Sequence, residues 1–346
     1  MDRVLIDSSD VNVKSAFRNL KSAILLCAML FALCLSAEAQ QPLAIPRIGM
    51  IYPGPKLDPT YASRHDAFRQ GLLQLGYVEG KNIIIDDRYA DGKLDRQPAL
   101  ASDLVRSKVD VIVAGGTTAV LAAKQATDSI PIVMAFTGSD PVRDGFVASL
   151  ARPGGNITGL TNISSELAGK RLELLAETIP KISRLAFLYY PANPAAKVAL
   201  QETDAAAQAF KIKLQSLAAQ SADQFENAFR SAVSGRAEAI IVQSGGLFTT
   251  HQNRIIDLAI KNRLPVMYTE QYFATAGGLM AYATSIPDLY RRAAVYVDKI
   301  LKGTKPGDLP VERPIKFELV INLKAAKQIG LTIPPNVLVR ADRVIR

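Results

Sequence analysis

The chain has 346 residues, 41 of them Lys or Arg and 32 Asp or Glu, which gives a formal net charge of +9. Its 2 cysteines, Cys27 and Cys34, lie within residues 1–39, which excludes cysteine nucleophiles and thiolate metal sites from the remaining chain. The basic residues are spread out, without an Arg-rich run or interleaved aromatic residues, so the charge predicts a solvated surface rather than a nucleic-acid interface.

Residues 1–39 have the pattern of a secretory signal peptide. Basic residues precede the apolar run 23–35, and small residues follow at Ala37 and Ala39, so cleavage is expected after Ala39. The run is shorter than the ~20 residues that a membrane span needs, and a buried N-terminal helix is the alternative. In Ala32-Leu33-Cys34, the residue just ahead of the cysteine is not the small one that usually precedes a lipidated cysteine. We therefore expect a periplasmic protein without a lipid anchor or stable membrane insertion.

After residue 39, short apolar runs alternate with amphipathic helical stretches. Predicted strands cover residues 48–51, 83–85, 109–113 and 132–136, and predicted helices run through 68–75, 100–105 and 117–127. Apart from Asp110, the runs are continuously apolar rather than alternating, and helices follow them. This pattern indicates a parallel sheet with helices on both faces.

The pattern is interrupted at 152–156 and then resumes. Predicted helices cover 166–178, 193–210, 225–233 and 255–261, and predicted strands cover 185–189, 213–216, 239–242 and 265–268. A strand at 278–282, a helix at 289–301 and an extended segment at 317–321 follow. Two β/α lobes with extra elements at the end indicate a chain that crosses between domains more than once, which suits a hinge. Two tandem domains joined by one linker are the alternative.

Candidate binding residues lie beyond the carboxyl ends of the strands, where open parallel sheets bind ligands. Loops such as 243–246 and 269–273 bring polar and aromatic groups to that edge, and Gly115-Gly116-Thr117-Thr118 opens a helix there. Glycines allow close approach to the backbone, and the free N–H groups of a helix start favour an anion. Thr117 and Thr118 are therefore predicted to bind a carboxylate, with a simple helix cap as the alternative. Asp140 is the candidate partner of an amine, although Asp before Pro also forms turns.

Aromatic residues gather at or near the strand ends. They are Tyr52, Tyr189, Tyr190, Tyr268, Tyr272, Phe273 and Tyr282. Such a rim is able to enclose an apolar or aromatic ligand, and packing within the core or between the lobes is the alternative. The chain has no phosphate-binding loop, no Gly-x-Gly-x-x-Gly opening a helix and no Gly-x-Ser-x-Gly. His65 and His251 do not have metal-ligand spacing, so we expect no catalytic residue, no metal and no cofactor.

Longer strings carry a family resemblance. They are residues 71–82, 149–160, 277–280, 290–294 and 316–323. The chain resembles the ABC-transporter substrate-binding proteins with the type I periplasmic-binding fold, in the branch related to tryptophan-binding receptors. The resemblance implies two Rossmann-like parallel-sheet lobes joined by a hinge of three crossovers near Gly159, Ala283 and Pro314. It implies an N-terminal lobe of residues 40–158 plus 284–313 and a C-terminal lobe of 159–283 plus 314–346.

By similarity, the ligand pocket draws on residues from both lobes. They are Tyr52, Thr117, Thr118, Ser139, Asp140, Asn193, Ser244 and Tyr268. The string Gly138-Ser139-Asp140-Pro141-Val142 is one residue longer than the Gly-Asp-Pro-Val of the relatives.

The residues and the resemblance together predict an extracytoplasmic solute-binding component of an ABC-type importer, and not an enzyme. The expected ligand is a small carboxylate-bearing molecule, an amino acid with an apolar or aromatic side chain, held between two closing lobes. Thr117 and Thr118 would hold its carboxylate and Asp140 its amine. The expected partners are this ligand and a membrane permease, and the protein is expected to be a monomer. An extracytoplasmic sensing module for a signalling partner and a secreted hydrolase are the alternatives.

Overall fold

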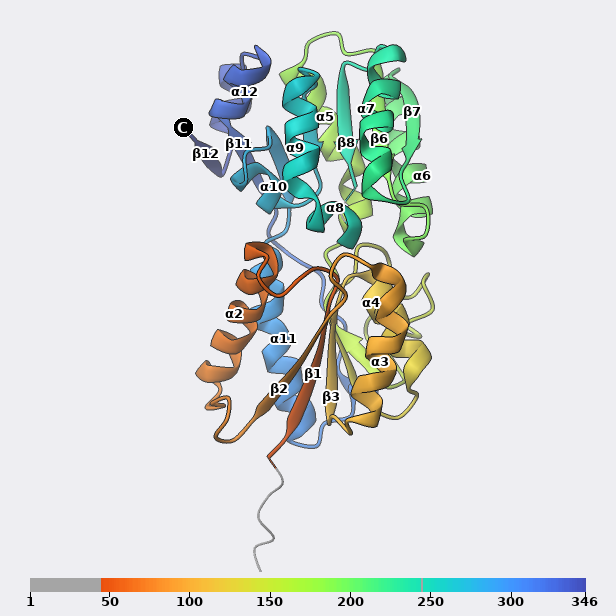
Figure 1. Cartoon of the computed structure of the whole chain (residues 1–346), viewed down its shortest axis with the longest axis vertical. Helices are drawn as coiled ribbons and strands as arrows, with labels where there is room; N and C mark the ends of the chain where they lie inside the picture. The colour runs from red at the N-terminus through yellow and green to blue at the C-terminus, as the bar shows by residue number, and fades with distance from the viewer. Residues whose placement is uncertain (1–44, 244) are drawn as a thin grey trace, which may run out of the picture. The chain divides into compact units, whose positions relative to one another are not determined.

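The computed structural model describes residues 45–243 and 245–346, so the predicted signal peptide lies outside the described residues. The described chain forms two α/β lobes, each built around one sheet (Figure 1). The N-terminal lobe has a 5-stranded sheet of order β2-β1-β3-β4-β5, and the C-terminal lobe a 7-stranded sheet of order β12-β11-β10-β9-β8-β6-β7. The predicted fold class, two Rossmann-like lobes, is confirmed.

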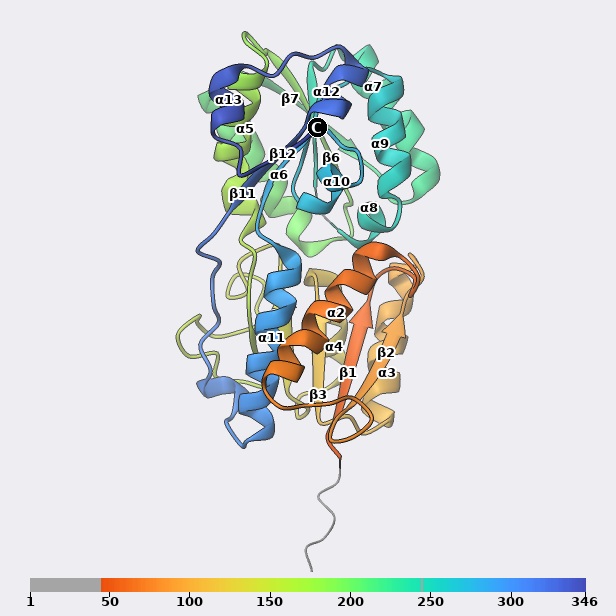
Figure 2. The same ribbon diagram turned by 90° about the vertical axis from the view of Figure 1, so that its left-hand side faces the viewer.

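The N-terminal sheet is parallel throughout its described strands. Its strands are β1 (Arg47–Tyr52), β2 (Ile84–Tyr89), β3 (Val111–Gly115), β4 (Ile132–Phe136) and β5 (Ile157–Gly159). Its helices are α2 (Pro59–Gln74), α3 (Gln97–Arg106), α4 (Thr117–Ala126) and α11 (Ile286–Leu301). Helices α2 and α11 pack together on one face and α3 and α4 on the other (Figure 2). Because both faces are covered, the residues of β3 and β4, and those of β1 after Arg47, are apolar in succession.

The C-terminal sheet is covered by α7 and α9 on one face and by α5 and α6 on the other. Its strands are β6 (Arg184–Tyr189), β7 (Lys213–Ala218), β8 (Ala239–Val242), β9 (Val266–Tyr268), β10 (Met280–Ala283), β11 (Glu318–Asn322) and β12 (Arg343–Ile345). Its helices are α5 (Ala168–Thr178), α6 (Pro194–Ala209), α7 (Phe225–Ser234), α8 (Gly246–Thr250), α9 (Gln252–Lys261), α10 (Gln271–Thr275), α12 (Leu323–Ile329) and α13 (Pro335–Val339). Short 3₁₀ turns occur at Leu94–Arg96, Ser164–Leu167, Ala222–Gln224 and Pro306–Asp308.

One strand pair departs from the expected parallel arrangement, because β10 and β11 are antiparallel. Strand β10 runs toward the N-terminal lobe, and the chain leaves the C-terminal lobe at its end to form α11. Strand β11 begins where the chain returns, beside the end of β10, and therefore runs away from that edge. The antiparallel pair is thus a direct consequence of a chain that leaves and re-enters the same lobe.

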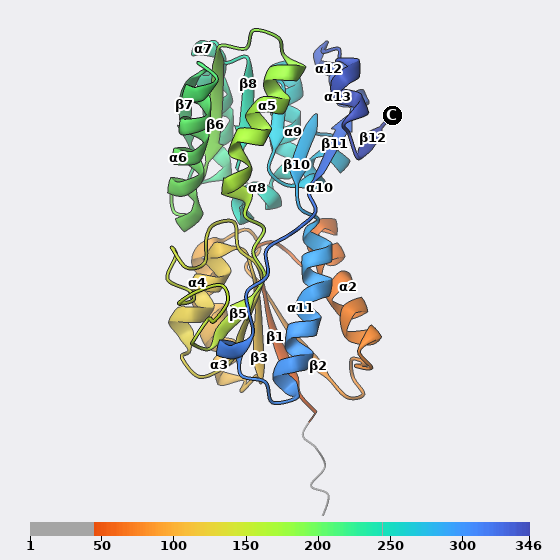
Figure 3. The same cartoon turned by 180° about the vertical axis from the view of Figure 1, so that it is seen from behind.

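Within the described residues the chain passes between the lobes three times: between β5 and α5, between β10 and α11, and before β11. The first and third passages run side by side (Figure 3). There the Thr161 N–H donates to the Glu312 carbonyl at 3.0 Å, and the Glu312 N–H donates to the Gly159 carbonyl at 2.9 Å. The predicted crossings near Gly159, Ala283 and Pro314 remain our proposal for where one lobe ends and the other begins.

The first passage between the lobes begins at Gly159, a position that only glycine can occupy. Its φ of +128° is strained for any residue with a side chain, and an added Cβ would lie 2.2 Å from the Met134 carbonyl oxygen of β4. Only glycine therefore allows β5 to lie this close to β4 before the chain turns out of the lobe.

Helices α2 and α6 begin at the edge where the lobes face each other, and their first residues explain why they begin there. Asp58 and Asn193 cap α2 and α6, accepting from the Thr60 N–H at 2.8 Å and the Ala195 N–H at 3.1 Å. A proline follows each cap, at the first helical position, where a missing N–H costs nothing. Among the described helices, none combines the length and the apolar composition that crossing a bilayer requires.

Candidate functional site

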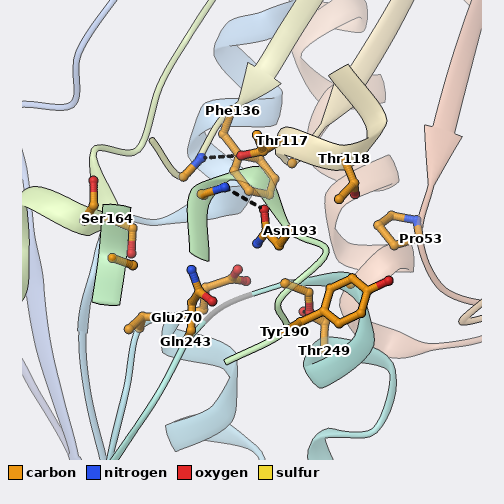
Figure 4. A pocket seen from close by; sticks show the side chains of 18 of the residues that line it. Pro53, Thr117, Thr118, Phe136, Ser164, Tyr190, Asn193, Gln243, Thr249 and Glu270 are labelled. Carbon is orange, nitrogen blue, oxygen red and sulfur yellow. Dashed lines mark hydrogen bonds between the residues drawn. The ribbon is translucent and has the colours of Figure 1, made fainter. Parts of the chain in front are cut away.

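A pocket lies where the carboxyl ends of the strands of both lobes meet (Figure 4). It encloses about 810 Å³ of space between protein atoms, including the part open to solvent. The residues that line it include Pro53, Arg64, Thr117, Thr118, Phe136, Ser164, Arg171, Phe187, Tyr190, Asn193, Ile241, Gln243, Thr249, Thr269 and Glu270. Among the described residues, no group of three or more His, Cys, Asp and Glu side chains is arranged to hold a metal ion.

The N-terminal lobe contributes the start of α4 to the pocket wall. Gly115 and Gly116 precede the helix, and Gly116 has a φ of +95°, which glycine adopts without strain. The Thr117 side chain is buried, and its hydroxyl oxygen accepts the Gly138 N–H at 3.3 Å. Thr118 is half-buried. Because the first N–H groups of a helix have no acceptor within it, this wall presents donors and the positive end of a helix dipole.

The start of α6 faces α4 from the C-terminal lobe. The Asn193 carbonyl oxygen Oδ1 is used to cap α6, so its amide Nδ2 is the group left for other partners. This Nδ2 lies 3.5 Å from the position that an added Cβ would take at Gly245. Asn193 thus adds a hydrogen-bond donor beside the glycines that follow β8.

The floor of the pocket is formed by residues that follow β8 and β9. These strands pair in parallel, with Val242 opposite Tyr268, so Gln243 lies beside Thr269. Gln243 and Thr269 are each 5% exposed, and Glu270 is 2% exposed. The Gln243 Oε1 and Thr269 Oγ1 atoms have no hydrogen-bond partner among the described residues. The floor of the pocket is therefore polar and buried, and two of its oxygen atoms have no hydrogen bond to a described residue.

A buried ion pair joins the two lobes at the edge of the pocket. Nη2 of Arg64, on α2, donates to Oε2 of Glu270 at 3.0 Å, and each side chain is only 3% exposed. The guanidinium lies 5.0 Å from the ring centre of Tyr61 and 5.4 Å from that of Tyr272. Burial alone lowers the pKa of Arg64, but Glu270 raises it, and the pKa ends above its ordinary value. Arg64 is therefore charged, and Glu270 supplies its counter-charge from the other lobe.

A second buried arginine, Arg171 of α5, holds two passages between the lobes. Its guanidinium donates to the Ser164 carbonyl at 2.6 Å, to the Ser164 hydroxyl at 3.1 Å and to the Tyr282 carbonyl at 3.0 Å. Burial lowers the pKa of Arg171 to about 9. Ser164 follows the first passage and Tyr282 precedes the second, so Arg171 fixes the hinge beside the pocket.

The structure brings Thr117, Thr118 and Asn193 together around the pocket. Four other predicted residues, Tyr52, Ser139, Asp140 and Tyr268, are not among its lining residues. Ser244 lies outside the described residues.

The two predicted tyrosines lie in the cores of the lobes. Tyr52 stacks on Tyr89 with ring centres 5.0 Å apart, and Tyr268 stacks on Phe273 at 4.5 Å. Both are fully buried. Side chains at strand ends alternate between the two helix-covered faces, and these two point toward helices rather than along the edge.

Ser139 and Asp140 complete their own loop instead of reaching the pocket. The buried Ser139 hydroxyl donates to the Asp144 carboxylate. Asp140 is exposed, and its carboxylate accepts the Val142 N–H at 2.9 Å. Asp140 therefore takes the turn-forming alternative that the following proline allowed.

Several polar residues of the pocket were not among the predicted site residues, although the sequence placed the loops 243–246 and 269–273 at the binding edge; they include Gln243, Thr269, Glu270, Arg64 and Arg171. Gln243, Thr269 and Glu270 directly follow strands, so the rule that found Thr117 also points to them. Arg64 and Arg171 lie within helices, where a polar residue usually faces solvent. No pattern in the sequence distinguishes them from the other arginines.

Comparisons with known proteins agree with this architecture. The profile of the family described as ABC transporter substrate binding protein matches residues 57–345. The "Tyrosine-binding protein" of Clostridioides difficile (strain R20291) is 27% identical over 273 residues, which are 79% of this chain and 78% of that protein.

Two solved structures superpose over 87% of this chain and 99% of their own. A conserved domain protein from Vibrio cholerae O1 biovar El Tor gives a TM-score of 0.81 at 27% identity. An ABC domain from Streptococcus pneumonia, in complex with L-Trp, gives a TM-score of 0.80 at 25% identity. The fold is that of the type I periplasmic-binding proteins.

Proposed function

Since the chain belongs to the family of ABC transporter substrate-binding proteins, we propose that it is the extracytoplasmic receptor of an ABC-type importer. In this proposal it binds a small carboxylate-bearing solute, an amino acid with an apolar or aromatic side chain, between its two lobes. The similar proteins support the choice of ligand, because one is named for tyrosine and another contains L-Trp.

The observation that carries this proposal is the start of α4 at the pocket wall. Gly115 and Gly116 let a ligand approach the backbone, and the first N–H groups of the helix are donors suited to a carboxylate. The hydroxyls of Thr117 and Thr118 stand at the same place and add hydrogen bonds. Asn193 adds its Nδ2 from the opposite lobe. A carboxylate has about four acceptor positions, so it accepts from several of these groups at once.

The remaining pocket lining suits an apolar or aromatic side chain. Its apolar members come from both lobes and include Pro53, Leu94, Phe136, Phe187, Tyr190 and Ile241. A ligand that contacts both sets is enclosed only when the lobes are close together. Closure would hold the ligand and present a surface made of both lobes to a membrane permease. The same proposal takes the protein to be periplasmic and monomeric.

Replacing Thr117 and Thr118 together by alanine is expected to weaken amino-acid binding by about 100-fold. Each hydrogen bond to a charged group contributes about 1.5–3 kcal/mol, and the helix N–H groups remain to bind part of the carboxylate. Isothermal titration calorimetry measures the change. The double Thr117→Ser, Thr118→Ser variant keeps both hydroxyls and should retain affinity. If the alanine variant binds the amino acid as tightly as the parent protein does, Thr117 and Thr118 do not bind the ligand.

A further inference from the structure

The floor of the pocket carries three buried polar side chains on two adjacent loops. Gln243 follows β8, and Thr269 and Glu270 follow β9, its neighbour in the sheet. Figure 4 shows Gln243 and Glu270 close together, on the opposite side of the pocket from Thr117 and Thr118. The pocket therefore has a donor-rich wall on one lobe and a second polar group of residues facing it on the other.

The floor is rich in acceptors. Gln243 Oε1 accepts hydrogen bonds only, and Thr269 Oγ1 both accepts and donates. Both atoms are buried without a partner among the described residues, and a buried polar atom is stabilised when a hydrogen-bond partner reaches it. Glu270 adds a carboxylate at the same place. A ligand group that brings several donors and positive charge would satisfy the Gln243 and Thr269 oxygens and lie beside this carboxylate, and a primary ammonium has three N–H donors and no acceptor.

Arg64 determines how Glu270 takes part. It donates to Glu270 Oε2 from the N-terminal lobe at 3.0 Å, which holds the carboxylate in place. The same contact offsets part of the negative charge of Glu270. Recognition of a ligand cation therefore depends on the neutral acceptors of Gln243 and Thr269 as well as on this carboxylate.

We propose that Gln243 Oε1, Thr269 Oγ1 and the Glu270 carboxylate form a subsite for a primary ammonium group of the ligand. The receptor then selects α-amino acids over carboxylic acids of the same side chain that lack the amine. This inference rests on the proposed function, in which the start of α4 holds the carboxylate. In this inference the ligand's ammonium group binds to residues at the floor of the pocket, in the C-terminal lobe. The sequence instead predicted that Asp140 binds the amine, but Asp140 is exposed and its carboxylate accepts a hydrogen bond from the Val142 N–H.

The test compares ligands that differ by one group. L-leucine, L-phenylalanine, L-tyrosine and L-tryptophan are titrated into the purified protein beside the corresponding acids without the amine and amines without the carboxylate. The amino acid that binds best is expected to bind at least about 10-fold more tightly than its acid, as expected when one hydrogen bond to a charged group is lost. Thr269→Val and Gln243→Leu should both reduce this ratio.

A matched control is available at Thr284. Its hydroxyl is also buried without a partner among the described residues, but Thr284 is not one of the residues that line the pocket. Thr284→Val should therefore leave the ratio of affinities unchanged. An equal reduction by Thr284→Val and Thr269→Val would assign the effect to general packing and overturn the subsite.

The outcomes separate this inference from the proposed function. If an acid without the amine binds as tightly as its amino acid, the ammonium subsite is wrong and the carboxylate receptor stands. If no compound with a carboxylate binds, the proposed function is wrong. In that case an amine that binds and is weakened by Thr269→Val still supports the subsite. No binding by any amine-bearing compound overturns it.

Discussion

Replacing Gly246 by alanine is expected to hold the lobes apart and to weaken ligand binding by at least about 100-fold. Gly246 begins α8 in the C-terminal lobe, and an added Cβ would lie 2.5 Å from Cβ of Pro53 and 2.7 Å from Cδ2 of Leu94. Both atoms belong to the N-terminal lobe, and the proline ring is too rigid to move aside. The clash lies between the lobes and not within either core, so it is relieved when the lobes move apart. The ligand then contacts only one lobe and binds more weakly.

The distance between the lobes reports this opening directly. Residues 40–346 contain no cysteine, so in a protein of these residues a pair of introduced cysteines in the two lobes accepts spin labels without further changes. Gly169→Ala is the matched control, because Gly169 lies in the first turn of α5 and an added Cβ there meets nothing within 4 Å. An unchanged distance and affinity in the Gly246→Ala variant would show that the lobes do not need to come this close.

Replacing Arg64 by methionine is expected to shift the protein toward an open form and to lower ligand affinity by about 100-fold. Removing one partner of a buried ion pair leaves the other charge uncompensated, at a cost of about 3–5 kcal/mol. Glu270 escapes this cost if the lobes separate and water reaches its carboxylate. Removing the ion pair is therefore expected mainly to increase the distance between the lobes, measured with the same spin labels. A lower melting temperature is the smaller effect.

A second variant separates the ion pair from the ammonium subsite. Arg64→Met combined with Glu270→Leu removes both charges, and replacing a buried pair by apolar side chains is often nearly neutral for stability. The double variant should regain the short distance between the lobes while it loses the preference for an amine. If Arg64→Met alone leaves both the distance and the affinity as in the parent protein, the pair does not control closure.

The sequence was informative where one physical rule acts locally. A helix was predicted over 193–210, and α6 is Pro194–Ala209, where Asn193 caps the helix and Pro194 opens it. Strand β3 was placed at 109–113, whereas the structure has Val111–Gly115, because an apolar run defines a strand better than it defines its ends. The five-residue helices α8 and α10 were not predicted, since neither is long enough to show a helical period.

The site was less predictable than the fold, for two reasons. Strands covered on both faces are apolar throughout, so the sequence does not show which way a terminal side chain points, and Tyr52 and Tyr268 were placed in the pocket although they lie in the cores. The pairing of Arg64 with Glu270 joins residues that are 206 positions apart. Such a contact depends on how the lobes come together, which no local pattern contains.

Thermal denaturation of the purified protein with a panel of amino acids, sugars, purines and small carboxylates tests the central claim most directly. A ligand present at about 100 times its dissociation constant adds about 2.7 kcal/mol to the free energy of unfolding, which raises the melting temperature by several degrees. We expect this shift with an amino acid that has an apolar or aromatic side chain. A shift produced by sugars or purines, with none from any amino acid, would contradict the proposed function.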